Sequence, residues 1–181
     1  MQWTNSKIRF GGIAIALHWL VALAVIGLFA LGWWMTELTY YSPWYQLAPW
    51  WHKSIGLTLA MIVLARIAWR FISPPPKPLE THTQTEVKIA KVAHLLLYLL
   101  LLVTFISGYL ISTADGRPIE VFGLFEVPAT LTSIENQEDI AGWVHWIVAC
   151  VLMGLAGLHA AAALKHHFID RDRTLLRILG R

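Results

Sequence analysis

The sequence is poor in cysteine and in charged residues. Among 181 residues there is one cysteine, Cys150, and only 14% of the residues are charged. One cysteine excludes a disulfide framework within the chain and a cluster of thiolate metal ligands, so we expect Cys150 to be a packing residue. With 57% hydrophobic residues and a mean hydropathy of +0.57, the chain differs from an average soluble protein. We therefore predict a polytopic membrane protein with a single membrane-embedded domain, residues 1–181.

Four apolar runs are each long enough to cross a bilayer. They cover residues 13–35, 50–72, 89–112 and 140–164. About 20 apolar residues suffice to span the hydrocarbon, and the first run is longer than the core of a signal peptide. The segment 73–78, SPPPKP, separates the second run from the third, and residues 174–179 have an apolar stripe suited to an anionic membrane surface. The predicted fold is all-α, a transmembrane four-helix bundle with a short amphipathic tail.

The charged residues divide unequally between the two sides of such a bundle. The side with both termini and the 73–88 loop has 12 basic residues: Lys7, Arg9, Arg66, Arg70, Lys77, Lys88, Lys91, Lys165, Arg171, Arg173, Arg177 and Arg181. It has four acidic residues, whereas the other side has two basic residues, Lys53 and Arg117, and seven acidic ones. The positive-inside rule then predicts cytoplasmic termini. The net charge is +3, but the basic residues lie beside apolar spans, as residues that orient a membrane protein do. No nucleic-acid binding is therefore expected.

The last apolar run contains two histidines, His145 and His159, fourteen residues apart. On a helix this spacing places them roughly 21 Å apart along the axis and about 40° apart around it, so both lie on one face. Ionisable residues in membrane helices are costly and usually functional. A heme iron with two imidazole ligands needs histidines at equal depth on two facing helices. The spacing therefore indicates two stacked hemes.

The other histidines of the spans lie at one of two expected depths in the membrane. His52 begins the second run and pairs with His145 at the outer level. His18, His94 and His159 all lie near the cytoplasmic side, so the residues alone leave three candidates for two axial positions. The spans offer no carboxylates at matching depth for a zinc or di-iron site. We expect His166 and His167 to lie in a solvated basic helix end, and we predict no role for His82 in its loop.

On the other spans, the residue fourteen positions after each histidine lies on the same helix face as that histidine. This fourteen-residue step connects His18 with Gly32, His94 with Gly108, and His52 with Arg66. Glycine permits close approach of a flat macrocycle, and an arginine can pair with half-buried heme propionates. Arg66 is accordingly the predicted propionate partner.

Several motifs together resemble the bacterial cytochrome b561 family over nearly the whole chain. They are HWLVAL at His18, WHKSIGL at Trp51, ARIAWRFISPPP at Ala65, AHLLLYLLL at Ala93, SGYLISTADGRPI at Ser107 and LHAAAALKHHFIDRD at Leu158. The resemblance implies two hemes b, the outer one on His52 and His145 and the inner one on His18 and His159. It also implies that Arg70, His94 and His166 lie near the inner heme or a bound quinone.

The same resemblance implies a function in the bacterial inner membrane. The family includes a superoxide oxidase, so one expectation is a superoxide:quinone oxidoreductase that passes electrons from a periplasmic donor to ubiquinone near the cytoplasm. The outer side, however, is mainly acidic and would repel an anion. The alternative is an electron-relay subunit for a basic periplasmic redox protein, with no small-molecule substrate of its own.

Overall fold

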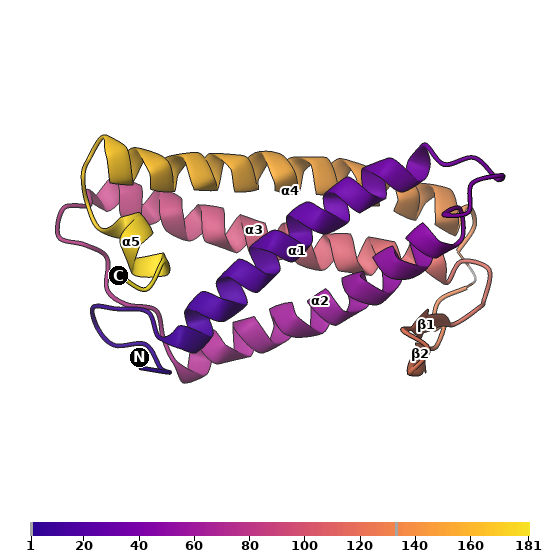
Figure 1. Ribbon diagram of the computed structural model, residues 1–181, viewed down its shortest axis with the longest axis horizontal. Coiled ribbons are helices and arrows are strands. Elements are labelled where there is room, and N and C mark those ends of the chain that lie inside the picture. Colours follow the sequence, from indigo (N-terminus) through magenta and orange to yellow (C-terminus); the bar gives the residue numbers. More distant parts are fainter. Residues whose placement is uncertain (1, 133) are drawn as a thin grey trace. The chain divides into compact units, whose positions relative to one another are not determined.

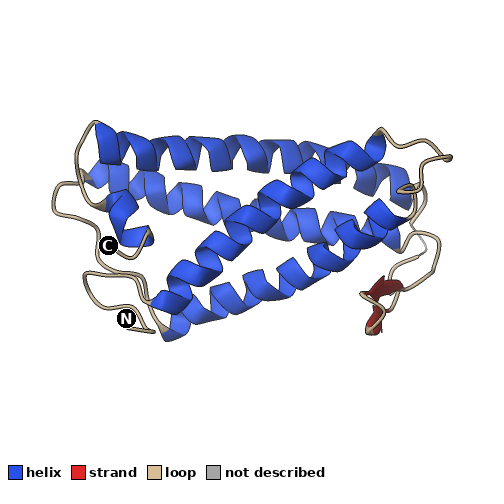
Figure 2. Ribbon diagram, viewed as in Figure 1, coloured by secondary structure: helices blue, strands red, loops and turns tan. Residues whose placement is uncertain are grey.

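The computed structural model describes residues 2–132 and 134–181, which are mostly helical (Figures 1 and 2). The long helices are α1 (Gly12–Thr36), α2 (Leu47–Ile72), α3 (Gln84–Ser112) and α4 (Gln137–Phe168). A short helix α5 (Thr174–Ile178) and a hairpin of β1 (Ile119–Val121) and β2 (Phe125–Val127) complete the secondary structure. The four predicted spans are confirmed as helices, and helix also forms within the predicted amphipathic tail.

The long helices begin earlier than the apolar runs do. Helix α3 begins at Gln84 because Thr83 and Glu86 form a capping box: Glu86 N–H donates to Thr83 Oγ1 at 3.2 Å, and Thr83 N–H donates to Glu86 Oε2 at 2.9 Å. Helix α2 begins at Leu47 and contains Pro49 in its first turn. Backbone N–H groups of the first turn have no partner within the helix, so the N–H that proline lacks is not missed there. The polar cap at Thr83 sets the beginning of α3, and a hydropathy pattern does not register it.

The surfaces of the long helices are apolar where they are exposed. Each helix is long and apolar enough to cross a membrane, and few of its residues are buried within the protein. Leu23, Leu64 and Val151, for example, are 65%, 56% and 51% exposed. Large apolar residues on helix exteriors are costly in water but favourable in lipid, so these faces are suited to contact with acyl chains.

The chain forms two compact units, and each long helix contributes a part to both. Unit 1 contains residues 1–22, 62–98 and 154–181, and unit 2 contains residues 23–61 and 99–153. Both chain ends and the loop between α2 and α3 therefore belong to unit 1. The connectors 37–46 and 113–136 belong to unit 2.

In unit 1, Asn5 joins the N-terminal segment to the end of α2. Its side-chain amide donates to the carbonyls of Ser73 at 2.7 Å and Pro74 at 3.2 Å, and its Oδ1 accepts from Gly11 N–H at 2.8 Å. The Asn5 N–H also donates to Ser73 Oγ at 2.8 Å. One side chain thus satisfies backbone groups from two separate segments.

Replacing Asn5 by alanine is expected to lower the free energy of unfolding by about 1–3 kcal/mol, since three side-chain hydrogen bonds are lost and the partly buried Ser73 carbonyl and Gly11 N–H remain unpaired. The measurement is the thermal unfolding midpoint of the purified protein in detergent. The exposed Gln2 supplies the control, Gln2→Ala, which should leave the midpoint unchanged. An equal midpoint for both variants would show that this network does not stabilise the protein.

In unit 2, the connector between α3 and α4 forms a hairpin of β1 and β2. Phe122 and Gly123 have positive φ angles of 52° and 69°, the conformation that a tight hairpin turn needs. Phe122 makes this strained turn while its ring packs on Trp50 and Trp51, and its N–H donates to Ser54 Oγ at 3.2 Å. These contacts hold the hairpin against the beginning of α2.

Candidate functional site

Unit 2 contains a cavity of about 520 Å³ lined by residues of all four long helices. His52 of α2 and His145 of α4 lie on its wall, with ring centres 6.2 Å apart and ring planes 69° from parallel. Most of the lining is apolar, and Phe29, Trp33 and Trp146 form an aromatic cluster there. Its volume falls in the range of typical cofactor pockets.

Two glycines leave room for these histidines. A Cβ atom at Gly32 would lie 3.1 Å from His52 Cε1, and one at Gly108 would lie 3.1 Å from His145 Cε1. Both distances are tighter than ordinary van der Waals contact, so any larger residue would push the imidazole aside. The structure therefore places the two glycines reached by the fourteen-residue step against the imidazoles of the cavity.

The His145 ring is oriented by backbone and hydroxyl groups of α3. Its Nδ1 lies 3.0 Å from the Thr104 carbonyl oxygen and 3.2 Å from Ser107 Oγ. A carbonyl only accepts, so Nδ1 carries the proton and Nε2 keeps its lone pair, as a metal-ligating imidazole requires. His52 Nδ1 is buried and makes no hydrogen bond within the part of the chain that the structure describes. The two rings thus differ in how firmly they are held.

Unit 1 brings together the three histidines that the sequence analysis placed at the inner level. The ring centres of His18 and His159 are 6.3 Å apart, and those of His94 and His159 are 5.1 Å apart. All three side chains are partly buried, and they come from α1, α3 and α4.

The two distances can be compared with the spacing that a metal ion needs. A metal–imidazole bond is about 2.0–2.1 Å and the ring centre lies about 1.1 Å beyond the nitrogen, so two imidazoles on opposite sides of one ion have centres about 6.3 Å apart. The pairs His52 with His145 and His18 with His159 match this value. The pair of His94 and His159 is about an ångström too close. The residues present therefore fit bis-histidine heme at two places.

Arg66 of α2 lies among the histidines of unit 1. One of its terminal nitrogens is 2.9 Å from His18 Nδ1, and its guanidinium carbon is 5.7 Å from the centre of the Tyr98 ring. Arg70 contacts the same ring at 5.7 Å. An arginine only donates, so His18 Nδ1 is the accepting nitrogen in this arrangement. A heme ligand bound through Nε2 needs the opposite tautomer, and Arg66 would then be free to pair with a propionate.

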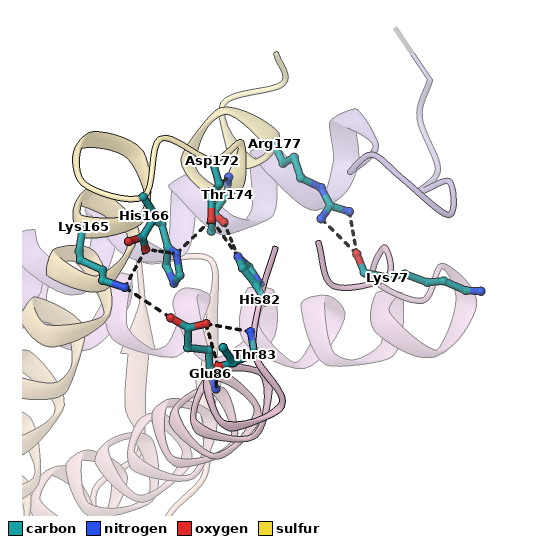
Figure 3. Close-up of polar contacts among 10 residues, drawn as sticks. Lys77, His82, Thr83, Glu86, Lys165, His166, Asp172, Thr174 and Arg177 are labelled. Atoms are coloured by element: carbon teal, nitrogen blue, oxygen red, sulfur yellow. Dashed lines mark hydrogen bonds and ion pairs between the residues drawn. The ribbon is translucent and has the colours of Figure 1, made fainter. Parts of the chain in front are cut away.

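His166 lies apart from these residues in unit 1, in a polar cluster at the end of α4 (Figure 3). Its Nδ1 is 2.9 Å from Asp170 Oδ2 and 3.1 Å from Asp172 Oδ2. His82, for which the sequence predicted no role, contacts Asp172 as well, at 3.1 Å. No local pattern around residue 82 signals this, because its partner lies 90 positions further along the chain.

Comparison with known proteins identifies the family. The family model for prokaryotic cytochrome b561 matches residues 9–181. "Cytochrome b561 homolog 2" of Escherichia coli (strain K12) is 52% identical, with coverage of 100% of this chain and 96% of that protein. "Probable superoxide oxidase CybB" of Yersinia pestis is 31% identical, with coverage of 94% and 96%. "Cytochrome b562" of Cereibacter sphaeroides is 29% identical, with 92% of each chain covered.

The match covers all four membrane-spanning helices and both groups of histidines. Cytochromes of this kind are bacterial multi-pass membrane proteins that use heme b in electron transfer. The chain belongs to the prokaryotic cytochrome b561 family.

Proposed function

We propose that this chain binds two hemes b and carries electrons from a donor at the periplasmic side to ubiquinone at the cytoplasmic side. His52 and His145 would hold the heme in unit 2, and His18 and His159 the heme in unit 1. The observation that carries the proposal is the ring-centre spacing of the two pairs, 6.2 Å and 6.3 Å. When bound, the hemes supply two one-electron carriers.

The residues of unit 1 have separate tasks in this proposal. Arg66, half-buried beside His18, supplies the positive charge that heme propionates need away from water. Arg70 and Tyr98 lie together on α2 and α3, and Tyr98 Oη is buried with no hydrogen-bond partner among the described residues. A quinone carbonyl could accept from such donors. We place ubiquinone near Arg70 and His94, with His166 in its vicinity.

The proposed direction rests on the distribution of charge. The 12 basic residues of the first group lie in segments of unit 1, together with both chain ends. The positive-inside rule assigns these segments to the cytoplasm. Electrons would then enter at unit 2 and leave at unit 1, where protons for quinone reduction come from the cytoplasmic side.

The proposed donor is superoxide, supported by the similarity to a protein named as a probable superoxide oxidase. Two superoxide anions each lose one electron and become dioxygen. One quinone takes the two electrons with two protons and becomes quinol. The chain's contribution is to hold both hemes, exclude water around them with the apolar cavity lining, and provide cations near the quinone.

Stopped-flow mixing of superoxide with the oxidised, heme-loaded protein tests this function. We expect reduction of heme that outpaces spontaneous superoxide dismutation and, with ubiquinone present, quinol formation at one quinol per two superoxide anions. Heme reduction no faster than in buffer controls with free heme would overturn superoxide as the donor while leaving the two-heme arrangement intact.

One observation favours the relay alternative. The cavity of unit 2 is lined by Asp115 and Glu138 and by a single basic residue, Lys53. Arg117 does not line it, and its guanidinium is paired with Asp115, with Nε 2.6 Å from Oδ2. Hydrogen bonds from the Arg117 N–H and side chain hold the pKa of Asp115 below its ordinary value, so this carboxylate is charged at neutral pH. The lining carries two carboxylates against one ammonium group, and this net charge of −1 favours a basic protein over superoxide as the donor.

Glu138→Gln distinguishes superoxide from a basic protein as the electron donor, because it should change their rate constants for heme reduction in opposite directions. Removing this negative charge is expected to raise the rate constant for reduction by superoxide about twofold to fivefold at low ionic strength, and to lower that for a reduced basic cytochrome c, because electrostatic steering acts on both. Glu37→Gln, in the connector before α2 and not among the residues that line the cavity, is the control. A variant with unchanged rates for both donors would show that the charge of the cavity lining does not steer either one.

A further inference from the structure

His82, His166 and Asp172 bring three potential metal-ligating atoms together in unit 1, apart from the histidines assigned to heme (Figure 3). The atoms are His82 Nε2, His166 Nδ1 and Asp172 Oδ2, and all lie within 4.8 Å of one another. They come from the loop before α3, the end of α4 and the turn before α5. The side chains are 16%, 15% and 4% exposed, so the group is largely shielded from water.

The spacing of these atoms is close to that of a tetrahedral ion. With bonds of about 2.0–2.2 Å, two ligand atoms on a tetrahedral zinc ion are about 3.3–3.5 Å apart. Asp172 Oδ2 is 3.1 Å from each of the two histidine nitrogens. The histidine ring centres are 4.7 Å apart, against about 5.2 Å expected for two imidazoles on such an ion. Shifts of a few tenths of an ångström would bring these distances to ligation geometry.

The two imidazole nitrogens differ in their hydrogen bonding. His82 Nε2 lies 3.1 Å from Asp172 Oδ2 and 3.0 Å from Thr174 Oγ1, and a cation bound there would replace the Thr174 contact. His166 Nδ1 is buried and makes no aligned hydrogen bond within the described part of the chain, although two carboxylate oxygens are near it. Asp172 directs its other oxygen, Oδ1, at the Thr174 N–H, which donates at 2.7 Å. This contact turns Oδ2 toward the two imidazoles, as outer partners of a metal ligand commonly do.

The nearby lysine, Lys165, has two carboxylate partners other than Asp172. Lys165 Nζ lies 2.7 Å from Asp170 Oδ2 and 3.4 Å from Glu86 Oε1, and Glu86 also caps α3. Asp172 Oδ2 lies 3.1 Å from both His82 Nε2 and His166 Nδ1. Asp172 is therefore a carboxylate that faces two imidazoles.

We propose that His82, His166 and Asp172 form a zinc site that fastens the C-terminal tail to the loop before α3 and to the end of α4. Two imidazoles and one carboxylate suit Zn²⁺ and leave a fourth position for water. Asp170, paired with Lys165, stays outside the ligand set. The site uses none of the four histidines proposed to bind heme, and it shares only His166 with the region where ubiquinone is proposed.

Zinc binding by the full-length, heme-loaded protein in detergent tests the proposal. After dialysis against a chelator, the protein is equilibrated with Zn²⁺ alone, and bound zinc per polypeptide is measured by mass spectrometry. We expect one tightly bound ion in the wild type, and a zinc K-edge absorption spectrum with nitrogen and oxygen neighbours at about 2.0 Å that include two imidazoles.

His82→Asn should weaken binding at least about tenfold, since losing even an outer partner of a ligand typically costs 10- to 100-fold, and should remove one imidazole from the spectrum. His167→Asn is the matched control: the adjacent histidine on α4 lies outside the group, and its replacement should leave the affinity unchanged. Heme content and elution volume confirm that each variant is folded.

Three results would overturn the proposal. The first is wild-type zinc affinity in His82→Asn. The second is a loss of zinc affinity in His167→Asn equal to that in His82→Asn. The third is a loss of zinc affinity in Glu86→Gln while His82→Asn keeps its affinity. That result would assign zinc to the more exposed group of Glu86, His166 and Asp170.

Discussion

Replacing His18 by alanine is expected to lower the heme content from the proposed two per polypeptide to about one, whereas His94→Ala should retain both. The ring centres of His18 and His159 are separated by 6.3 Å, which leaves room for an iron atom between them, but those of His94 and His159 are only 5.1 Å apart. One axial histidine cannot hold the heme of unit 1 as two do. A pyridine hemochrome assay, divided by protein concentration, gives the ratio directly.

His94→Ala is the matched control because it removes the same side chain from the same cluster. Its retained content of two hemes, with the wild-type elution volume, would show that burial and folding survive such a truncation. If His94→Ala lost one heme and His18→Ala none, the ligand pair would be His94 and His159, and α4 would need to shift to accommodate an ion. Equal losses in both would contradict the assignment of the pair.

His145→Ala is expected to abolish fast reduction by superoxide although one heme remains bound. His145 lines the cavity of unit 2, and its Nδ1 contact with the Thr104 carbonyl at 3.0 Å fixes the ligating nitrogen. Without His145, the heme proposed for unit 2, where electrons are proposed to enter, is lost. The observed rate should fall to that of the buffer control, at least tenfold below the wild type. Stopped-flow absorbance of the remaining heme is the measurement.

His18→Ala serves as the counterpart in the same experiment. It retains His52 and His145, so superoxide should still reduce its remaining heme at close to the wild-type rate, while quinol formation fails. This opposite pattern in the two variants would establish that electrons enter through unit 2. Fast reduction of His145→Ala together with slow reduction of His18→Ala would reverse the proposed direction.

Much of the fold could be predicted from the sequence because hydropathy in a membrane protein is a strong, local signal. The four apolar runs give the four long helices, and each run lies within its helix. The helix ends are different. Thr83 and Glu86 begin α3 five residues before its apolar run, and Phe122 and Gly123 turn a hairpin in the connector between α3 and α4. Both depend on backbone hydrogen bonds and dihedral angles, which apolar content does not encode.

Helical periodicity also carried information about the candidate site. The fourteen-residue step from His18 and His94 leads to Gly32 and Gly108, and the structure places both against the imidazoles of the cavity. Periodicity works here because a straight helix repeats its face. It could not choose between His18 and His94 as the partner of His159, since both have suitable depth. The difference between ring-centre distances of 6.3 Å and 5.1 Å exists only after the helices have packed.

The sequence by itself determined that this chain crosses a membrane four times and carries histidines at two depths, because length, hydropathy and helical repeat are properties of neighbouring residues. Only the tertiary structure decided which histidine rings have centres 6.2 Å and 6.3 Å apart, the spacing that the proposed hemes need. It also decided that His82, His166 and Asp172 meet, since their side chains come from segments up to 90 positions apart. Contacts at such separations depend on how helices and loops pack, and no local pattern specifies them.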